Sequence, residues 1–163
     1  MATTNGDGPF RKVKAWVATE GRWSFEGATA HYLKPERADY AVGTVLTDIR
    51  GSDVTVRFGA TLKAIPDPPP GENATAAGAI LGVGGPERRD VVVGLGGWGS
   101  AYFIAQFKPG SGYVPLDHGG TLANLIPHQR YQVEAIQRGQ MVALSIDAVR
   151  VFEVRLPEPL GGN

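Results

Sequence analysis

The sequence of 163 residues contains no cysteine. Disulfide bonds, thiolate metal ligands and a cysteine nucleophile are therefore excluded, and the fold has to be held by packing. The redox compartment stays open, because a chain without cysteine is stable in oxidising and in reducing surroundings.

The chain also lacks an excess of charge of either sign. Its 16 Lys and Arg side chains balance its 16 Asp and Glu side chains. A balanced chain has no net field that would draw it onto a polyphosphate or an anionic membrane. We therefore expect no nucleic acid and no membrane among its partners.

Long apolar runs are missing as well, since no stretch approaches the roughly 18 residues of a membrane-spanning helix. Residues 1–9 are polar and glycine-rich, without the basic start and apolar run of a secretory signal. As given, the sequence predicts a cytoplasmic protein. It predicts a secreted one if the chain is a domain cut from a longer protein.

Glycine and proline, by contrast, are abundant, with 23 and 12 residues that lie between short apolar runs. Such spacing is typical of strands joined by turns, and the apolar residues recur with period two. Residues 52–62 show this best, because the apolar side chains fall at every second position. They are Val54, Val56, Phe58, Ala60 and Leu62. One face of this strand should be buried in the core and the other exposed to solvent.

Further strands are predicted from the same pattern, and no helix of useful length is expected. Their ranges are 23–33, 40–49, 77–83, 90–95, 101–107, 131–138, 141–146 and 149–156. The last three are joined by such short turns that they must form an antiparallel meander. In the final turn, Asp147-Ala148, either the turn is not type I′ or Ala148 adopts a positive φ.

The strand pattern predicts an all-β fold, an antiparallel β-sandwich, in one domain over residues 13–160. Residues 1–12 form a flexible segment before it. Residues 65–75 carry four prolines and should form a stiff exposed loop within that domain. The predicted core includes seven aromatic and aliphatic residues, one of them either of two phenylalanines. They are Trp16, Trp23, Phe58, Phe103 or Phe107, Leu144, Ile146 and Phe152.

Three segments resemble laminin G-like and related concanavalin A-like domains. Residues 16–23 look like the tryptophan-bounded entry strand of that family, and residues 77–83 with 90–95 are similar to its paired glycine-rich and valine-rich strands. Residues 130–149 resemble its closing hairpin. The resemblance implies a jelly-roll sandwich. The superfamily includes lectins, carbohydrate-binding modules, glucanases, 3-keto-disaccharide hydrolase-like domains and intracellular recognition domains, so the resemblance leaves the chemistry open.

Catalytic and metal-binding patterns are weak. The Glu-x-Asp-x-x-Glu pattern of concanavalin A-like glucanases, whose carboxylates must flank one glycosidic bond, is missing. His31, His118 and His128 lack the spacing of metal ligands, and we predict no metal and no cofactor. Asp117-His118 is the one adjacent acid and imidazole, and it lies in residues 109–120, predicted as a glycine-rich loop.

Sugar recognition combines an aromatic ring on the sugar face with planar polar groups at the hydroxyls. Trp98 and Tyr113 lie among glycines, where an uncrowded ring at a loop tip is expected, although Trp98 could equally be a buried anchor. Four polar residues on predicted strands could share one ligand-binding face or form an ordinary wet face. They are Arg57, Gln106, Gln132 and Glu134.

The sequence thus favours a non-catalytic recognition domain, with a carbohydrate as the expected ligand. The candidate ligand-binding residues are Trp98, Tyr113, Asp117, His118, Arg57, Gln106 and Glu134. One alternative is a glycoside-acting enzyme in which Asp117, His118 or Glu134 would do acid-base work. The other is an intracellular interaction or assembly domain, with a protein partner or a second copy of the chain.

Overall fold

The computed structural model describes residues 17–20, 22–26, 29–33, 44–46, 53–62, 77–82, 89–97, 99–121 and 124–160. The chain divides into two compact units, Met1–Ile49 and Arg50–Asn163, and each is described by itself. Most of the predicted domain falls in the second unit, and its full extent stays a prediction. Residues 1–12 and the proline-rich segment lie outside the described residues. Within those ranges, no helix is long and apolar enough to cross a bilayer.

The first unit contains two small antiparallel pairs of strands. β1 (Val17–Glu20) pairs with β4 (Thr44–Leu46), and β2 (Trp23–Glu26) pairs with β3 (Thr29–Tyr32). The single strand expected over residues 23–33 is therefore a hairpin, because Glu26 and Thr29 are register partners. Trp23 is half-buried and does not belong to the buried core, whereas Trp16 lies outside the described residues.

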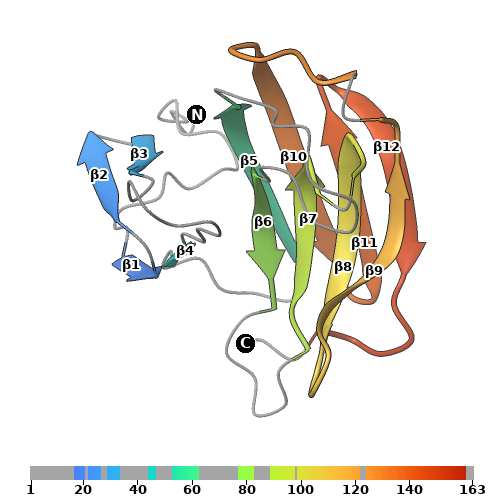
Figure 1. Cartoon of the computed structure of the whole chain (residues 1–163). Helices are drawn as coiled ribbons and strands as arrows, with labels where there is room; N and C mark the ends of the chain where they lie inside the picture. Colours follow the sequence, from blue (N-terminus) through green and yellow to red (C-terminus); the bar gives the residue numbers. More distant parts are fainter. Residues whose placement is uncertain are drawn as a thin grey trace, which may run out of the picture. The chain divides into compact units, whose positions relative to one another are not determined.

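The second unit is an antiparallel β-sandwich, as predicted, and Figure 1 shows its two sheets as two layers. The first layer, the β10 sheet, has the order β12-β11-β10-β5. Its strands are β5 (Asp53–Thr61), β10 (Arg130–Arg138), β11 (Met141–Ile146) and β12 (Val149–Arg155). The second layer, the β8 sheet, has the order β6-β7-β8-β9. Its strands are β6 (Ala77–Leu81), β7 (Val91–Leu95), β8 (Tyr102–Lys108) and β9 (Gly112–Gly119).

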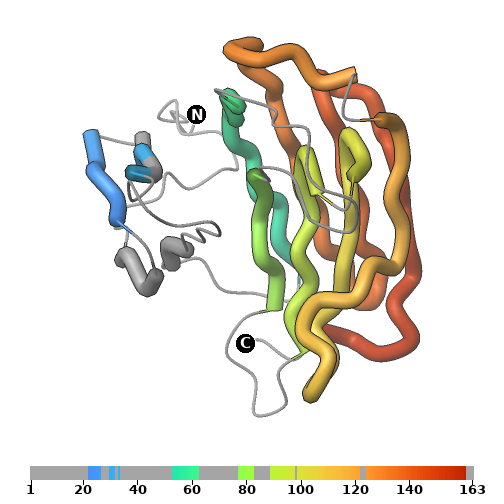
Figure 2. The backbone as a smooth tube through the Cα atoms, viewed as in Figure 1, coloured from blue at the N-terminus to red at the C-terminus, as the bar shows by residue number. Residues whose placement is uncertain are grey.

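The predicted meander is confirmed, and a strand from far earlier in the chain completes its sheet. β10, β11 and β12 pair in succession. β5 pairs antiparallel with β10 along nine register positions, and Figure 2 shows residues 53–61 running beside residues 130–138. The sheet therefore depends on pairing between residues that are 69 (130 − 61) to 85 (138 − 53) positions apart in the sequence.

The core lies between the two sheets and follows the period-two pattern. On β10, Val133 and Ala135 are buried and pair with Phe58 and Val56 of β5. Val91, Val93 and Leu95 of β7 belong to the same core cluster. Leu144 and Phe152 are buried in that cluster as predicted, and Phe58 and Ile146 pack against it. Phe103 is buried outside the cluster, and Phe107 is half-buried.

β9 was not expected from the sequence, which predicted a loop over residues 109–120. Lys108 and Gly112 are register partners, so a turn of three residues separates β8 from β9. Gly110 and Gly112 have φ values of 80° and 72°, which glycine adopts without strain. β9 is an edge strand, and this position tolerates Pro115, because an edge residue need not donate to a neighbour on both sides.

The turn between β11 and β12 has two residues, and both have a positive φ. Asp147 has φ 49° and Ala148 has φ 66°, the signs of a type I′ turn. The second of the two predicted alternatives is therefore correct. Asp147 also joins the turn to β10, since its Oδ1 accepts from Gln132 N at 2.8 Å and its own N donates to Gln132 O at 2.8 Å.

Leu144→Ala should lower the free energy of unfolding by about 2 to 5 kcal/mol, because Leu144 is fully buried in the core cluster and truncation leaves a cavity. Urea denaturation followed by circular dichroism measures the change. Val149→Ala is the control, since Val149 is 64% exposed and its loss should change stability by no more than about 0.5 kcal/mol. Equal effects of the two substitutions would contradict the assigned core.

Ala148→Gly should raise the free energy of unfolding by about 1 kcal/mol, because glycine relieves the left-handed strain at this position. Thermal unfolding provides the measurement. The matched control is Ala143→Gly in β11, where the same change should destabilise through lost strand propensity. A loss of stability with Ala148→Gly would argue against the type I′ turn.

Candidate functional site

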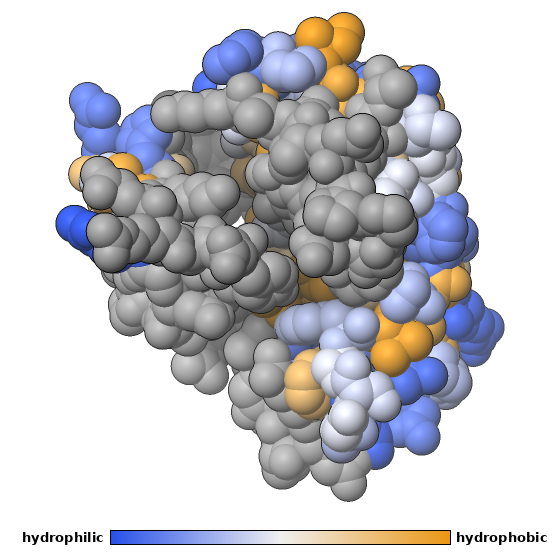
Figure 3. Space-filling view, in the orientation of Figure 1, coloured by the Kyte–Doolittle hydropathy of each residue, from blue (hydrophilic) through white to orange (hydrophobic). Residues whose placement is uncertain are grey.

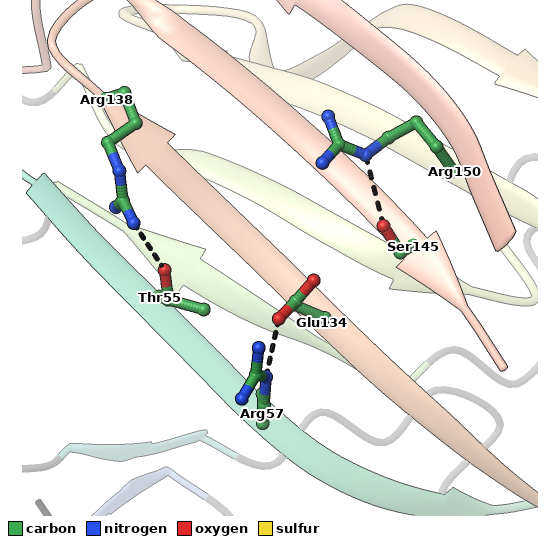
Figure 4. Close-up of polar contacts among 6 residues, drawn as sticks. All are labelled: Thr55, Arg57, Glu134, Arg138, Ser145 and Arg150. Carbon is green, nitrogen blue, oxygen red and sulfur yellow. Dashed lines mark hydrogen bonds and ion pairs between the residues drawn. The ribbon is translucent and has the colours of Figure 1, made fainter. Parts of the chain in front are cut away.

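A row of polar side chains crosses all four strands of the β10 sheet, on the face away from the core. Arg57 of β5 is the register partner of Glu134 of β10, Glu134 is the partner of Ser145 of β11, and Ser145 is the partner of Arg150 of β12. Figure 4 shows Arg57 directed toward Glu134, and Arg150 directed toward Ser145. The alternation that puts Val133 and Ala135 into the core is what turns Glu134 outward.

Hydrogen bonds join neighbouring side chains at each end of the row. Arg57 Nε donates to Glu134 Oε1 at 2.5 Å, with the Arg57 side chain 56% exposed and that of Glu134 25% exposed. Arg150 Nε donates to Ser145 Oγ at 3.1 Å, and its Nη1 donates to Glu153 Oε2 at 2.7 Å. The row therefore presents charged groups to solvent above a buried serine.

Two further arginines of β10 extend this surface. Arg138 Nη2 donates to Thr55 Oγ1 at 3.0 Å, as Figure 4 shows, and Nη1 donates to the carbonyl of Gln137 at 2.9 Å. The guanidinium of Arg130 lies over Gly59, where a Cβ would stand 2.5 Å from Arg130 Nε. A side chain at position 59 would require the Arg130 guanidinium to move. We call the outward-facing charged and hydroxyl residues of this sheet the arginine face: Asp53, Thr55, Arg57, Thr61, Arg130, Glu134, Arg138, Ser145, Arg150, Glu153 and Arg155.

The four polar residues predicted to share one face do not all do so. Arg57, Glu134 and Gln132 lie together on the outer side of the β10 sheet. Gln106 lies in β8, opposite Val91, which is fully buried in the core. The period-two pattern identified outward positions correctly on β5 and β10, but it could not assign strands to sheets.

Tyr113 lies within β9 and is half-buried, which corrects the expectation of an uncrowded ring at a loop tip. Its hydroxyl donates to Asp90 Oδ2, and its ring meets the edge of Phe107 with 5.6 Å between centroids. Asp90 is 2% exposed, so this hydrogen bond satisfies a buried carboxylate. These contacts give Tyr113 a structural role, and its predicted role in ligand binding would be additional to it.

Asp117 and His118 also lie within β9, and both are exposed. Asp117 Oδ1 accepts from the backbone N of His118 at 2.8 Å, and His118 Nδ1 lies 3.0 Å from Ser100 Oγ.

Trp98 lies outside the described residues. Figure 3 views the second unit from the side of the β8 sheet, where hydrophilic and hydrophobic residues alternate over the described surface.

Within the described ranges, the three acid-base candidates do not all lie together. Glu134 lies in the β10 sheet, whereas Asp117 and His118 lie at the edge of the β8 sheet, so the three groups belong to different layers. Among the residues with assigned positions, no three His, Asp or Glu side chains come together as metal ligands. The largest polar constellation described is the arginine face.

Sequence reasoning missed most of the arginine face. Arg150 could have been found, because the two-residue turn makes Ile146 and Val149 partners, and a meander then sets Ser145 and Arg150 beside Glu134. Thr55 could not, because its contact with Arg138 depends on the pairing of β5 with β10.

No protein-family model matches the chain, and no curated protein matches it in sequence. Among solved structures, it is similar to a carbohydrate-binding module, CBM66, from Bacillus subtilis. The two are 16% identical in sequence, and the TM-score is 0.69. The match covers 94% of this chain and 86% of the other. At this identity the likeness supports the β-sandwich fold.

Arg57→Ala and Glu134→Gln should each lower the free energy of unfolding by less than about 1 kcal/mol, with a coupling energy of about 0.2 to 1 kcal/mol, because the Arg57 side chain is 56% exposed and solvent screens the pair. A double-mutant cycle in urea measures both quantities. High salt should weaken the coupling. A coupling of several kcal/mol would mean that the pair holds the sheet together.

Proposed function

We propose that the chain is a non-catalytic carbohydrate-binding domain of the concanavalin A-like kind, and that the arginine face is its binding surface. The observation that carries the proposal is the structural likeness, over 94% of the chain, to a protein described as a carbohydrate-binding module. Folds host many functions, so the proposal also needs a surface with suitable chemistry.

The arginine face has the groups that sugar recognition uses. Guanidinium groups are planar donors, and carboxylates accept from hydroxyls. Arg57 and Glu134 are paired already, so a sugar hydroxyl can receive from one and donate to the other without large rearrangement. Strands hold these groups more rigidly than loops would.

The contacts of the other predicted ligand residues are less favourable. Gln106 is the register partner of the buried Val91 and so lies on the core side of its sheet, and the hydroxyl of Tyr113 donates to Asp90. Asp117 and His118 remain candidates for a separate contact at the edge of the β8 sheet, and Trp98 remains a prediction. The enzyme alternative stays a prediction, with Asp117 and His118 together in β9 and Glu134 in the other sheet.

The test is a glycan array followed by isothermal titration calorimetry with the sugars that bind. We expect Arg57→Ala combined with Glu134→Gln to weaken binding at least about tenfold, because hydrogen bonds to charged groups are lost. The matched control combines Arg89→Ala with Glu158→Gln, an exposed ion pair outside the arginine face. This control should bind as the wild type does.

Two results would overturn the proposal. The first is a folded wild-type chain that binds no glycan. The second is equal weakening by both pairs of substitutions, since that would separate binding from the arginine face. The bound sugar should also be recovered intact, because the proposed domain does not cleave its ligand.

A further inference from the structure

The arginine face carries more positive than negative charge, although the whole chain is balanced. Its strand positions hold five arginines, at 57, 130, 138, 150 and 155, and three carboxylates, at 53, 134 and 153. Five minus three leaves a formal charge of +2 on this one surface, against a net charge of zero for the 163 residues. The excess is therefore local.

The carboxylates of the arginine face are already engaged. Asp53 Oδ1 accepts from the backbone N of Gly139 at 3.0 Å. Glu134 pairs with Arg57, and Glu153 pairs with Arg150. Glu134 and Glu153 thus offset Arg57 and Arg150, whereas Asp53 has a neutral donor and keeps its charge beside its register partner Arg138, which leaves the excess at +2.

The remaining arginines contact neutral groups. Arg138 donates to a threonine hydroxyl and a carbonyl, and Arg155 Nη2 donates to Gln140 Oε1 at 3.3 Å. In the part of the chain that the structure describes, Arg130, Arg138 and Arg155 make no ion pair. Three guanidinium charges on one sheet face are thus available to an anion.

We propose that the preferred ligand of the arginine face is an acidic polysaccharide built of uronic acids. This inference rests on the proposed function and adds the class of sugar. A uronate carboxylate is planar and matches the two parallel donors of a guanidinium. On binding to Arg138 it would replace the neutral Thr55 hydroxyl with a charged partner. Hydroxyls of the same polymer would meet Arg57 and Glu134.

The charge of the polymer can be changed without changing its backbone. Polygalacturonate and its fully methyl-esterified form differ in the carboxylate alone, and calorimetry compares their binding to the wild-type chain. We expect the acid form to bind about tenfold more tightly, because charged partners strengthen the hydrogen bonds. Its affinity should fall as salt is raised, whereas that of the ester should not. Alginate and hyaluronan extend the comparison to other uronates.

Arg138→Gln tests the assigned residue. It should weaken binding of the acid form about tenfold and binding of the ester by clearly less, because only the acid form offers a charged partner. Arg89→Gln, outside the arginine face, is the matched control and should change neither. Circular dichroism checks that both variants fold. If a variant does not fold, the salt dependence of polygalacturonate binding by the wild-type chain still tests the inference.

The outcomes separate this inference from the proposed function. If neutral glycans bind as tightly as uronates, the inference is wrong and the proposed function stands. If no glycan binds, both are wrong. Preference for sulfated over uronate polymers, or equal binding to double-stranded DNA, would also overturn the inference, because the face would then be a general anion site.

Discussion

The antiparallel register between β5 and β10 is the constraint on which the sandwich and its polar face both depend. It pairs Phe58 with Val133 on the core side and Arg57 with Glu134 on the solvent side. A slip of one residue would exchange the two faces, burying the charged pair and exposing the core. Burial of the apolar positions thus determines where the arginines stand, and the polar contacts need contribute little to stability.

The two sheets use their outer sides differently. The β10 sheet presents arginines, hydroxyls and carboxylates in register across four strands. The β8 sheet has, at its β9 edge, the buried Asp90 bound by Tyr113, and His118 beside Ser100. An antiparallel sheet can be solvated on one face. The outer face of the β10 sheet therefore exposes charged groups that a ligand can contact. The polar groups of the β8 sheet named above form hydrogen bonds within the protein.

The fold class and the meander could be predicted because both rest on local patterns: apolar residues at every second position, and turns too short for anything but hairpins. β9 was not predicted because glycine and proline are also typical of loops, and its residues form a strand only through pairing with β8. The misassignment of Gln106 has a similar cause. Alternation shows that a residue faces one side of its own strand, without showing which sheet the strand joins.

The sequence by itself determined an all-β sandwich with a closing meander and, on β5 and β10, the outward positions of Arg57 and Glu134. These follow from the chemistry of neighbouring residues. Only the tertiary structure decided that Arg57 meets Glu134, that Arg138 meets Thr55, and that Tyr113 meets Asp90. Each of those contacts joins segments distant in sequence, and strand pairing, which no local pattern encodes, brings them together.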